Sequence, residues 1–152
     1  DKVNIEGLIS HVISIVTNQA QNKNISISKD IRLKTNDFIG DNDEIKQMLI
    51  NLIDNAIKYT QVNGSVRVEA YDDEDKLIIT VADSGIGIPK EHIPRLFERF
   101  YRVDKARSKK IGGTGLGLAI VKHIVKSYNG EIEVDSTVGV GTKFTVILSR
   151  KA

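Results

Sequence analysis

The sequence predicts an α+β fold with two layers, one of helices and one formed by a mostly antiparallel sheet. Two stretches, 5–21 and 45–60, carry apolar residues three and four positions apart, which predicts amphipathic helices. Four shorter stretches alternate apolar and polar residues and are joined in pairs by turn-forming segments, which predicts two β-hairpins. Helices and hairpins with one apolar side each pack face to face in layers.

The N-terminal third contains two predicted helices with a short strand between them. The helix over 5–21 has Asn4 as its N-cap, and the alternation over 25–31 predicts the strand. Asp41 is a good N-cap for the second helix, and Glu44, three residues later, would complete a capping box. The apolar stripe of this second helix consists of Ile45, Met48, Leu49, Leu52, Ile53, Ala56 and Ile57.

The middle of the chain holds the first predicted hairpin. Its strands lie over 66–70 and 77–81, with the acidic turn 72–75 between them. Pro89 then favours the start of another helix, because its fixed φ suits the first helical turn. The side of that helix predicted to be buried carries Ile93, Leu96, Phe97 and Phe100.

The C-terminal third is predicted to contain a loop, a helix and the second hairpin. Residues 101–111 have no apolar period and are followed by Gly112 and Gly113, which predicts a mobile loop. The helix over 116–128 ends at an Asn-Gly pair, a typical helix terminus. The second hairpin has strands over 131–135 and 143–148, joined by a glycine-containing turn.

The composition excludes several classes of protein. At 152 residues, with 40% hydrophobic and 28% charged residues, the chain fits one folded domain rather than a disordered tail. No apolar run reaches the roughly 18 residues that a membrane-spanning helix needs, and the first residues lack a signal-peptide pattern. Because the chain has no cysteine, disulfides, thiolate metal sites and thiol nucleophiles are excluded.

Positive charge is concentrated in one segment. Residues 95–110 hold seven Lys or Arg against two Asp or Glu, a net +5, in a chain whose formal net charge is +2, so the rest carries −3. A basic segment in an otherwise mildly acidic domain indicates a local anionic partner. Charge alone leaves open nucleic acid, a membrane surface and a phosphorylated small molecule.

Three polar residues share one sector of the second predicted helix. Asn51, Asn55 and Lys58 lie within about 60° of one another at 100° per residue, away from the apolar stripe. One interpretation is a solvated helix face. The other is a site for a hard cation, because amide oxygens suit Mg²⁺ bound together with phosphate oxygens, which Lys58 would also reach.

A second polar group follows the predicted strand 77–81. Asp83 lies at the strand end, and Gly85 and Gly87 come directly after it. Asp-Ser-Gly is ordinary turn chemistry. A carboxylate in this place can also accept a hydrogen bond from an exocyclic amine such as that of adenine, while the glycines would let a flat ring approach the backbone.

Two further segments are rich in glycine. The segment 112–118 leads into a predicted helix, where backbone N–H groups can bind phosphate. A flexible hinge is the alternative, because the segment lacks both the Gly-Lys-Ser/Thr of a P-loop and the preceding strand of a dinucleotide fold. The shorter motif 139–142 is the weakest of these signals, and a plain hairpin turn explains it better.

In their order and spacing these motifs resemble the ATP-binding catalytic domain of bacterial sensor histidine kinases, within the wider family that includes gyrase, the Hsp90 chaperone and the mismatch-repair ATPases. Residues 51–59 resemble the N box, 83–89 the first glycine box and 97–104 the F box. Segment 113–119 resembles the second glycine box and 139–142 a third. The resemblance implies a two-layer α/β sandwich of the Bergerat type, with helices on one face of the sheet and a mobile ATP lid.

The resemblance also implies roles for individual residues. Asn55 would ligate Mg²⁺, Lys58 and Arg102 would contact phosphate, and Asp83 would bind the adenine amine. No general base and no acceptor of its own is implied. The full set implied for ATP binding is Asn51, Asn55, Lys58, Tyr59, Asp83, Gly85, Gly87, Ile88, Tyr101, Arg102, Lys105, Gly113, Thr114, Gly115, Leu116, Gly117 and Thr142.

One position favours a kinase over an ATP-driven clamp. Water-hydrolysing members of the family carry a Glu four residues before the metal-binding Asn, and here that residue is Asn51, whose amide cannot act as a general base. The resemblance therefore implies transfer of the γ-phosphoryl group to a histidine that heads a His-Glu or His-Asp motif. None of His11, His92 and His123 is followed by an acidic residue.

The chain is therefore expected to be one catalytic domain over 1–152, a soluble C-terminal fragment without its histidine-acceptor domain. The implied partners are the dimerisation and acceptor domain of the same kinase and the receiver domain of a response regulator. The parent protein is expected to be a membrane-anchored homodimer with this domain in the cytoplasm, similar to phosphate-starvation and cell-wall sensing kinases. Nucleic acid is not an expected partner, because Phe97 and Phe100 fit a buried helix face better than a stacking surface.

Two alternatives stay open at this point. A protein serine kinase of the anti-sigma-factor type shares the fold. A nucleotide-responsive binding module, in which ATP sets the shape of the lid and no phosphate is transferred, belongs to a different functional class.

Overall fold

The computed structural model of the chain describes residues 1–99, 101 and 117–150. Its helices are α1 (Ile5–Asn22), α2 (Asn42–Lys58) and α4 (Gly117–Ser127), with a 3-10 helix η1 (Lys90–Arg95). Its strands are β1 (Lys2–Asn4), β2 (Ser26–Arg32), β3 (Asp37–Ile39), β4 (Ser65–Asp73), β5 (Lys76–Asp83), β6 (Glu131–Thr137) and β7 (Gly141–Ser149). Among these helices none has the length and apolar character needed to cross a membrane.

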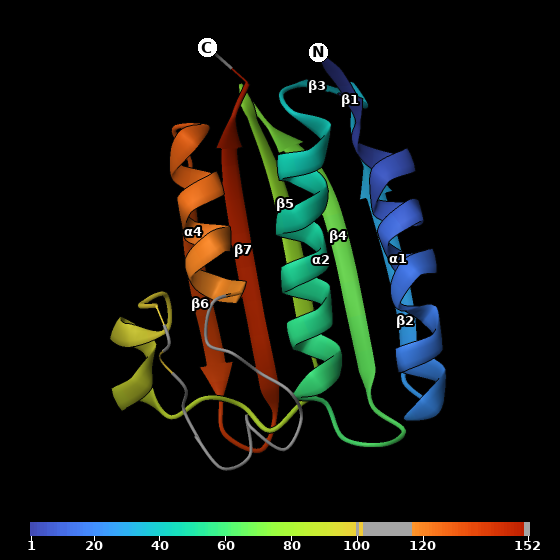
Figure 1. Cartoon of the computed structure of the whole chain (residues 1–152), viewed down its shortest axis with the longest axis vertical. Coiled ribbons are helices and arrows are strands. Elements are labelled where there is room, and N and C mark those ends of the chain that lie inside the picture. Colours follow the sequence, from blue (N-terminus) through green and yellow to red (C-terminus); the bar gives the residue numbers. More distant parts are fainter. Residues whose placement is uncertain (100, 102–116, 151–152) are drawn as a thin grey trace.

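The structure confirms the predicted two-layer α+β fold. Five strands form one sheet in the order β2-β4-β5-β7-β6, in which β2 and β4 are parallel and all other neighbours are antiparallel. Helices α1, α2 and α4 lie side by side over one face of this sheet (Figure 1). Both predicted hairpins are present, as β4–β5 and β6–β7.

The core lies between the helices and the sheet. All seven residues of the predicted apolar stripe of α2 are buried, because this helix lies between α1 and α4 over the middle of the sheet (Figure 1). The central strand β5 is buried on both faces from Leu77 to Val81. The C-terminal ends of α2 and β5 therefore belong to well-packed elements, and both lie at the lower end of the view in Figure 1.

The helix caps are partly as predicted. The side chain of Asn4 accepts a hydrogen bond from the backbone N–H of Gly7, which confirms the first cap. Asp41 caps α2 by accepting from two backbone N–H groups, but the expected capping box is wrong. The hydroxyl of Tyr128 accepts from the backbone N–H of Asp41 (2.8 Å) and donates to Glu44 Oε1 (3.0 Å), so it stands between the two residues.

Two parts of the fold differ from the prediction. Strands β1 and β3 form a separate two-stranded antiparallel sheet that the sequence did not indicate. The helix expected after Pro89 is only the short η1, because Pro94 lies inside it and has no N–H to donate. Of its expected buried residues, Leu96 is buried and Phe97 packs against the core, whereas Ile93 is only half-buried. Phe100 lies outside the described residues.

Candidate functional site

The candidate site is built where the end of α2, the end of β5 and the β6–β7 turn meet. Asp83 is the last residue of β5 and is paired in register with Thr142 at the start of β7. The loop after β5 contacts the end of α2, because the backbone N–H of Ile86 donates to the carbonyl of Tyr59 (3.2 Å). Residues far apart in sequence thus share one end of the molecule.

Asp83 presents a half-buried carboxylate with one oxygen in use. Its Oδ1 accepts from the backbone N–H of Gly85 (2.8 Å) and of Thr142 (3.3 Å). Within the described part of the chain Oδ2 accepts no hydrogen bond. Burial raises the pKa of the Asp83 carboxyl above its ordinary value of 3.8, and the two backbone hydrogen bonds act in the opposite direction. The residue therefore offers one acceptor oxygen in a partly desolvated place.

This raised pKa predicts a pH dependence of stability. Between its unfolded and folded pKa the folded chain binds more protons at Asp83, so the stability contributed by this group falls as the pH rises through the folded pKa. We expect the unfolding free energy of Asp83→Asn to increase relative to the wild type as the pH is raised from about 4 to 7. Urea unfolding of both proteins at several pH values measures this difference. A difference that is constant or changes the other way would contradict it.

The two glycines after Asp83 lie where other backbone segments approach closely, which the sequence analysis did not predict. A Cβ at Gly85 would overlap the carbonyl oxygen of Tyr59, and one at Gly87 would overlap that of Thr137. Gly87 also has a φ of 77°, a backbone conformation that residues with a side chain rarely adopt. The close approach that needs these glycines is therefore an approach of other backbone segments. A ring that binds here would therefore contact a loop that already packs against the backbone of Tyr59 and of Thr137.

Ser136 is a site residue that the sequence analysis missed. Its Oγ accepts from the backbone N–H of Ile88 (2.7 Å) and lies 2.8 Å from Oγ1 of Thr142. It therefore ties the loop after β5 to the strand that pairs with Asp83. A signal was present, because Ser136 continues the half-buried alternation of Ile132 and Val134 at a position where an apolar residue is expected.

The polar residues predicted to share one sector of α2 all lie on this helix, and one of them has an ion-pair partner that was not predicted. The half-buried side chain of Asn55 makes no hydrogen bond within the described residues. The ammonium of Lys58 lies 3.0 Å from Oδ2 of Asp54, one turn earlier on the same helix. Lys23 at the end of α1 donates to the carbonyls of Ile57 and Lys58, which fixes the last turn of α2.

Asn51 lies one turn before Asn55 and reaches the neighbouring helix. Its Nδ2 donates to the carbonyl oxygen of Gly117 (3.3 Å), the first residue of α4. Its Oδ1 accepts from Nε2 of Gln47 (3.0 Å), a second partner that the sequence analysis missed. The position of the absent general base is thus held by an amide that bridges two helices.

The predicted basic side of the site is described only in part. The Tyr101 hydroxyl is hydrogen-bonded to Nδ1 of His92, and the guanidinium of Arg95 lies 4.5 Å from the centre of the Tyr101 ring. Six predicted site residues lie outside the described residues, as does the expected mobile loop apart from Tyr101. These six are Arg102, Lys105, Gly113, Thr114, Gly115 and Leu116.

The donor set of the described residues fits a magnesium–nucleotide complex better than a protein-only metal site. In this part of the chain no group of three or more His, Cys, Asp or Glu could hold a metal ion. Mg²⁺ at phosphates usually takes one or two protein oxygens and obtains the rest from water and phosphate. The amide oxygen of Asn55, half-buried and without a partner among these residues, fits that demand.

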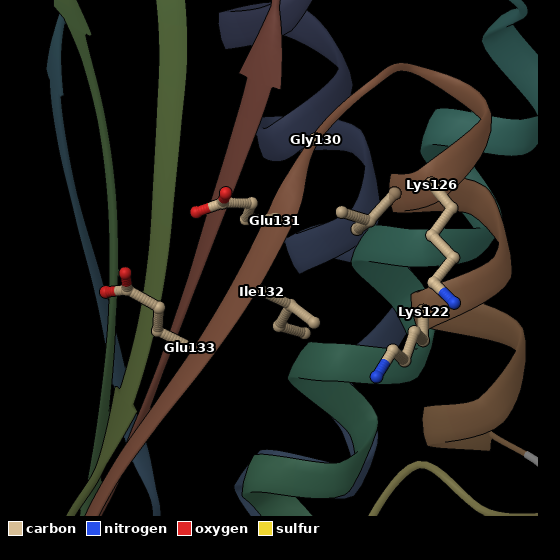
Figure 2. A pocket seen from close by; sticks show the side chains of 7 residues that line it. Lys122, Lys126, Gly130, Glu131, Ile132 and Glu133 are labelled. Carbon is tan, nitrogen blue, oxygen red and sulfur yellow. The ribbon is translucent and has the colours of Figure 1, made fainter.

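A cavity of about 280 Å³ lies elsewhere, between α4 and the edge strand β6. Figure 2 shows Lys122 and Lys126 on its helix side and Ile132 pointing into it, while Glu131 and Glu133 point away to the other side of the strand. It contains none of the candidate site residues. The cavity is therefore separate from the candidate site.

The chain is similar in sequence to known proteins. The family model described as histidine kinase-, DNA gyrase B- and HSP90-like ATPase matches residues 40–152. The sensor histidine kinase WalK of Bacillus subtilis is 50% identical over 113 residues, which are 73% of this chain and 18% of that protein. Curated relatives of this kind are longer proteins, of which the chain spans 18% to 38%.

Solved structures are similar over almost the whole chain. Full-length ShkA in complex with AMPPNP has a TM-score of 0.86 and 30% identity, covering 97% of this chain and 30% of ShkA. Histidine kinase ThkA in complex with the response regulator protein TrrA has a TM-score of 0.82 and 26% identity, covering 99% of this chain and 42% of ThkA. The similarity includes the five-stranded sheet and the helices over it.

Proposed function

The chain belongs to the family of histidine kinase-, DNA gyrase B- and HSP90-like ATPases, as an ATP-binding kinase domain of the sensor histidine kinase type. On this premise we propose that it binds ATP with Mg²⁺ and donates the γ-phosphoryl group to a histidine on a separate dimerisation and acceptor domain. From there the phosphoryl group would pass to an aspartate of a response regulator. Phosphoryl transfer of this kind depends on positioning and electrostatics rather than on covalent chemistry by the protein.

The observation that carries the proposal is the hydrogen bonding of the two carboxylate oxygens of Asp83. Its Oδ1 accepts from two backbone N–H groups, while its Oδ2 accepts from none of the described residues and lies in a partly buried place. The exocyclic amine of adenine can donate to Oδ2. A carboxylate fixed in this way recognises adenine by charge-assisted hydrogen bonding without having to move.

The phosphate side of the site would be formed by α2 and by the basic segment. Asn55 would hold Mg²⁺ through its amide oxygen, and the metal would neutralise the charge that develops on the phosphates. Lys58 and Arg102 would contact phosphate oxygens. Lys58 must exchange part of its contact with Asp54 for phosphate, a small cost because a half-exposed ion pair is worth about 1 kcal/mol or less.

Two features support transfer to a protein rather than to water. Asn51 cannot take a proton from water, because an amide has no basic site at neutral pH. The nearest carboxylate on the same helix, Asp54, is paired with Lys58. A bound ATP would therefore keep its γ-phosphoryl group until an acceptor arrives.

The acceptor would lie on another domain. His11 and His123 are exposed on helices without a following acidic residue, and His92 is bonded to Tyr101. ThkA, solved with a response regulator protein, supports a receiver domain as the next partner in the relay.

The test is transfer in trans. The chain is incubated with γ-labelled ATP and Mg²⁺, with and without a helical-hairpin acceptor domain from a related sensor kinase. We expect acid-labile phosphate on the acceptor histidine and none on the chain alone. Acid-stable phosphate on a serine would favour the serine kinase alternative. No transfer despite ATP binding would favour a binding module.

A substitution at Gly117 should separate folding from nucleotide binding. A Cβ there would lie 3.9 Å from Cγ of Asn51, an ordinary contact, and the residue is not among those with positive φ. Alanine should therefore raise the unfolding free energy by about 0.5–1 kcal/mol. It should lower ATP affinity about tenfold if the methyl group displaces a phosphate from the backbone. Urea unfolding and calorimetry measure the two effects, and unchanged affinity would contradict a phosphate contact here.

A further inference from the structure

Helices α2 and α4 are joined by a chain of two side-chain hydrogen bonds. Gln47 donates through Nε2 to Oδ1 of Asn51 (3.0 Å), and Asn51 donates through Nδ2 to the carbonyl of Gly117 (3.3 Å). Gln47 and Asn51 are four residues apart on α2, so they lie on the same face of the helix. Figure 1 shows α2 and α4 side by side, with the first turn of α4 facing the C-terminal half of α2.

The second bond determines which way the Asn51 amide points. An asparagine side chain has one oxygen that only accepts and one NH₂ group that only donates. Because the carbonyl of Gly117 only accepts, the NH₂ group of Asn51 faces α4 and its oxygen faces Gln47, whose NH₂ group holds it in this position. The reverse orientation would place the Asn51 oxygen against the carbonyl oxygen of Gly117, where two acceptors would repel each other.

We propose that Gln47 is a positioning residue and that Asn51 tethers the first turn of α4 to α2. The inference rests on the proposed function in one respect, since α4 begins directly after the segment assigned to the phosphates.

Amide hydrogen exchange of the chain without nucleotide tests the tether. By the helix pattern the N–H of Val121 bonds to the carbonyl of Gly117, so its exchange reports opening of the first turn of α4. Gln47→Met removes the donor with little change in shape, and Asn51→Ala removes the tether. Each should speed exchange at Val121 roughly three- to tenfold, as the loss of one net hydrogen bond predicts.

The double variant and a donor-preserving variant make the test specific. Gln47→Met with Asn51→Ala should exchange no faster than Asn51→Ala alone, because both changes break the same chain of bonds. Gln47→Lys keeps a donor and should exchange at the wild-type rate. Exchange at Leu52 in the middle of α2 should be the same in all variants and so reports an intact fold. Wild-type exchange at Val121 in Gln47→Met, or a summed effect in the double variant, would overturn the proposal.

If the wild type binds no ATP at all, the proposed function fails, whereas the exchange experiment still decides whether the tether exists.

Discussion

Replacing Asp83 by asparagine should lower ATP affinity by about a hundredfold or more while the chain stays folded. The variant oxygen can still accept from the backbone N–H groups of Gly85 and Thr142, so the local structure is kept. Its NH₂ group would face the adenine amine, so a charge-assisted hydrogen bond worth about 1.5–3 kcal/mol is replaced by two opposed donors. Isothermal titration calorimetry with ATP and Mg²⁺ measures the loss.

Asp135→Asn is the matched control for this change. It makes the same chemical replacement on the exposed face of β6, opposite to the face that carries Ser136, and should leave ATP affinity unchanged. Circular dichroism of both variants shows whether the fold is retained. Wild-type affinity in Asp83→Asn would remove adenine recognition from this residue, and with it the main support for the proposed site.

Replacing Asn55 by alanine should abolish the effect of Mg²⁺ on ATP binding and reduce phosphoryl transfer about a hundredfold or more. The loss of one ligand to an ion that stabilises developing charge on the phosphates costs several kcal/mol in the transition state. The fold should become slightly more stable, by a few tenths of a kcal/mol, because alanine is the better helix former and Asn55 has no hydrogen bond within the described residues.

Calorimetry in the presence of Mg²⁺ and of EDTA measures this effect. The wild type should bind ATP more tightly with Mg²⁺, and Asn55→Ala should bind with the same affinity in both solutions. Asn18→Ala, on the exposed face of α1, makes the same replacement away from the site and should behave as the wild type. Full enhancement by Mg²⁺ in Asn55→Ala would show that the metal has other ligands.

The sequence predicted those parts of the fold that follow from periodicity. Apolar residues three and four positions apart predicted the helices α1 and α2, and the alternation of apolar and polar residues predicted both hairpins. The residue types of Asn4 and Asp41 predicted the two N-caps. The β1–β3 sheet was not predicted, because three-residue strands are too short to show alternation. The pairing of β2 with β4 could not be predicted either, because parallel strands are joined by a long crossover connection rather than by a tight turn and so leave no local turn signal.

The candidate site was predicted in composition but not in its contacts. Asp83 and Thr142 were both selected, and the structure brings them together through the β5–β7 register. The hydrogen bonds of Gln47 and Ser136 depend on which segments meet in space, and such polar residues look like ordinary surface positions in one sequence. For the same reason Gly85 was interpreted as space for a ring, although it is needed for contact with Tyr59.

The central claim is that adenine lies at Asp83 and the triphosphate at Asn55, and NMR of the isotope-labelled chain tests it most directly. Adenosine should shift the backbone amide signals of Gly85 and Thr142, which donate to Asp83, and leave the side-chain amide of Asn55 unchanged. ATP with Mg²⁺ should shift all three. If the largest shifts with both ligands instead fall at the cavity between α4 and β6, around Lys122 and Ile132, the assignment of the site is wrong.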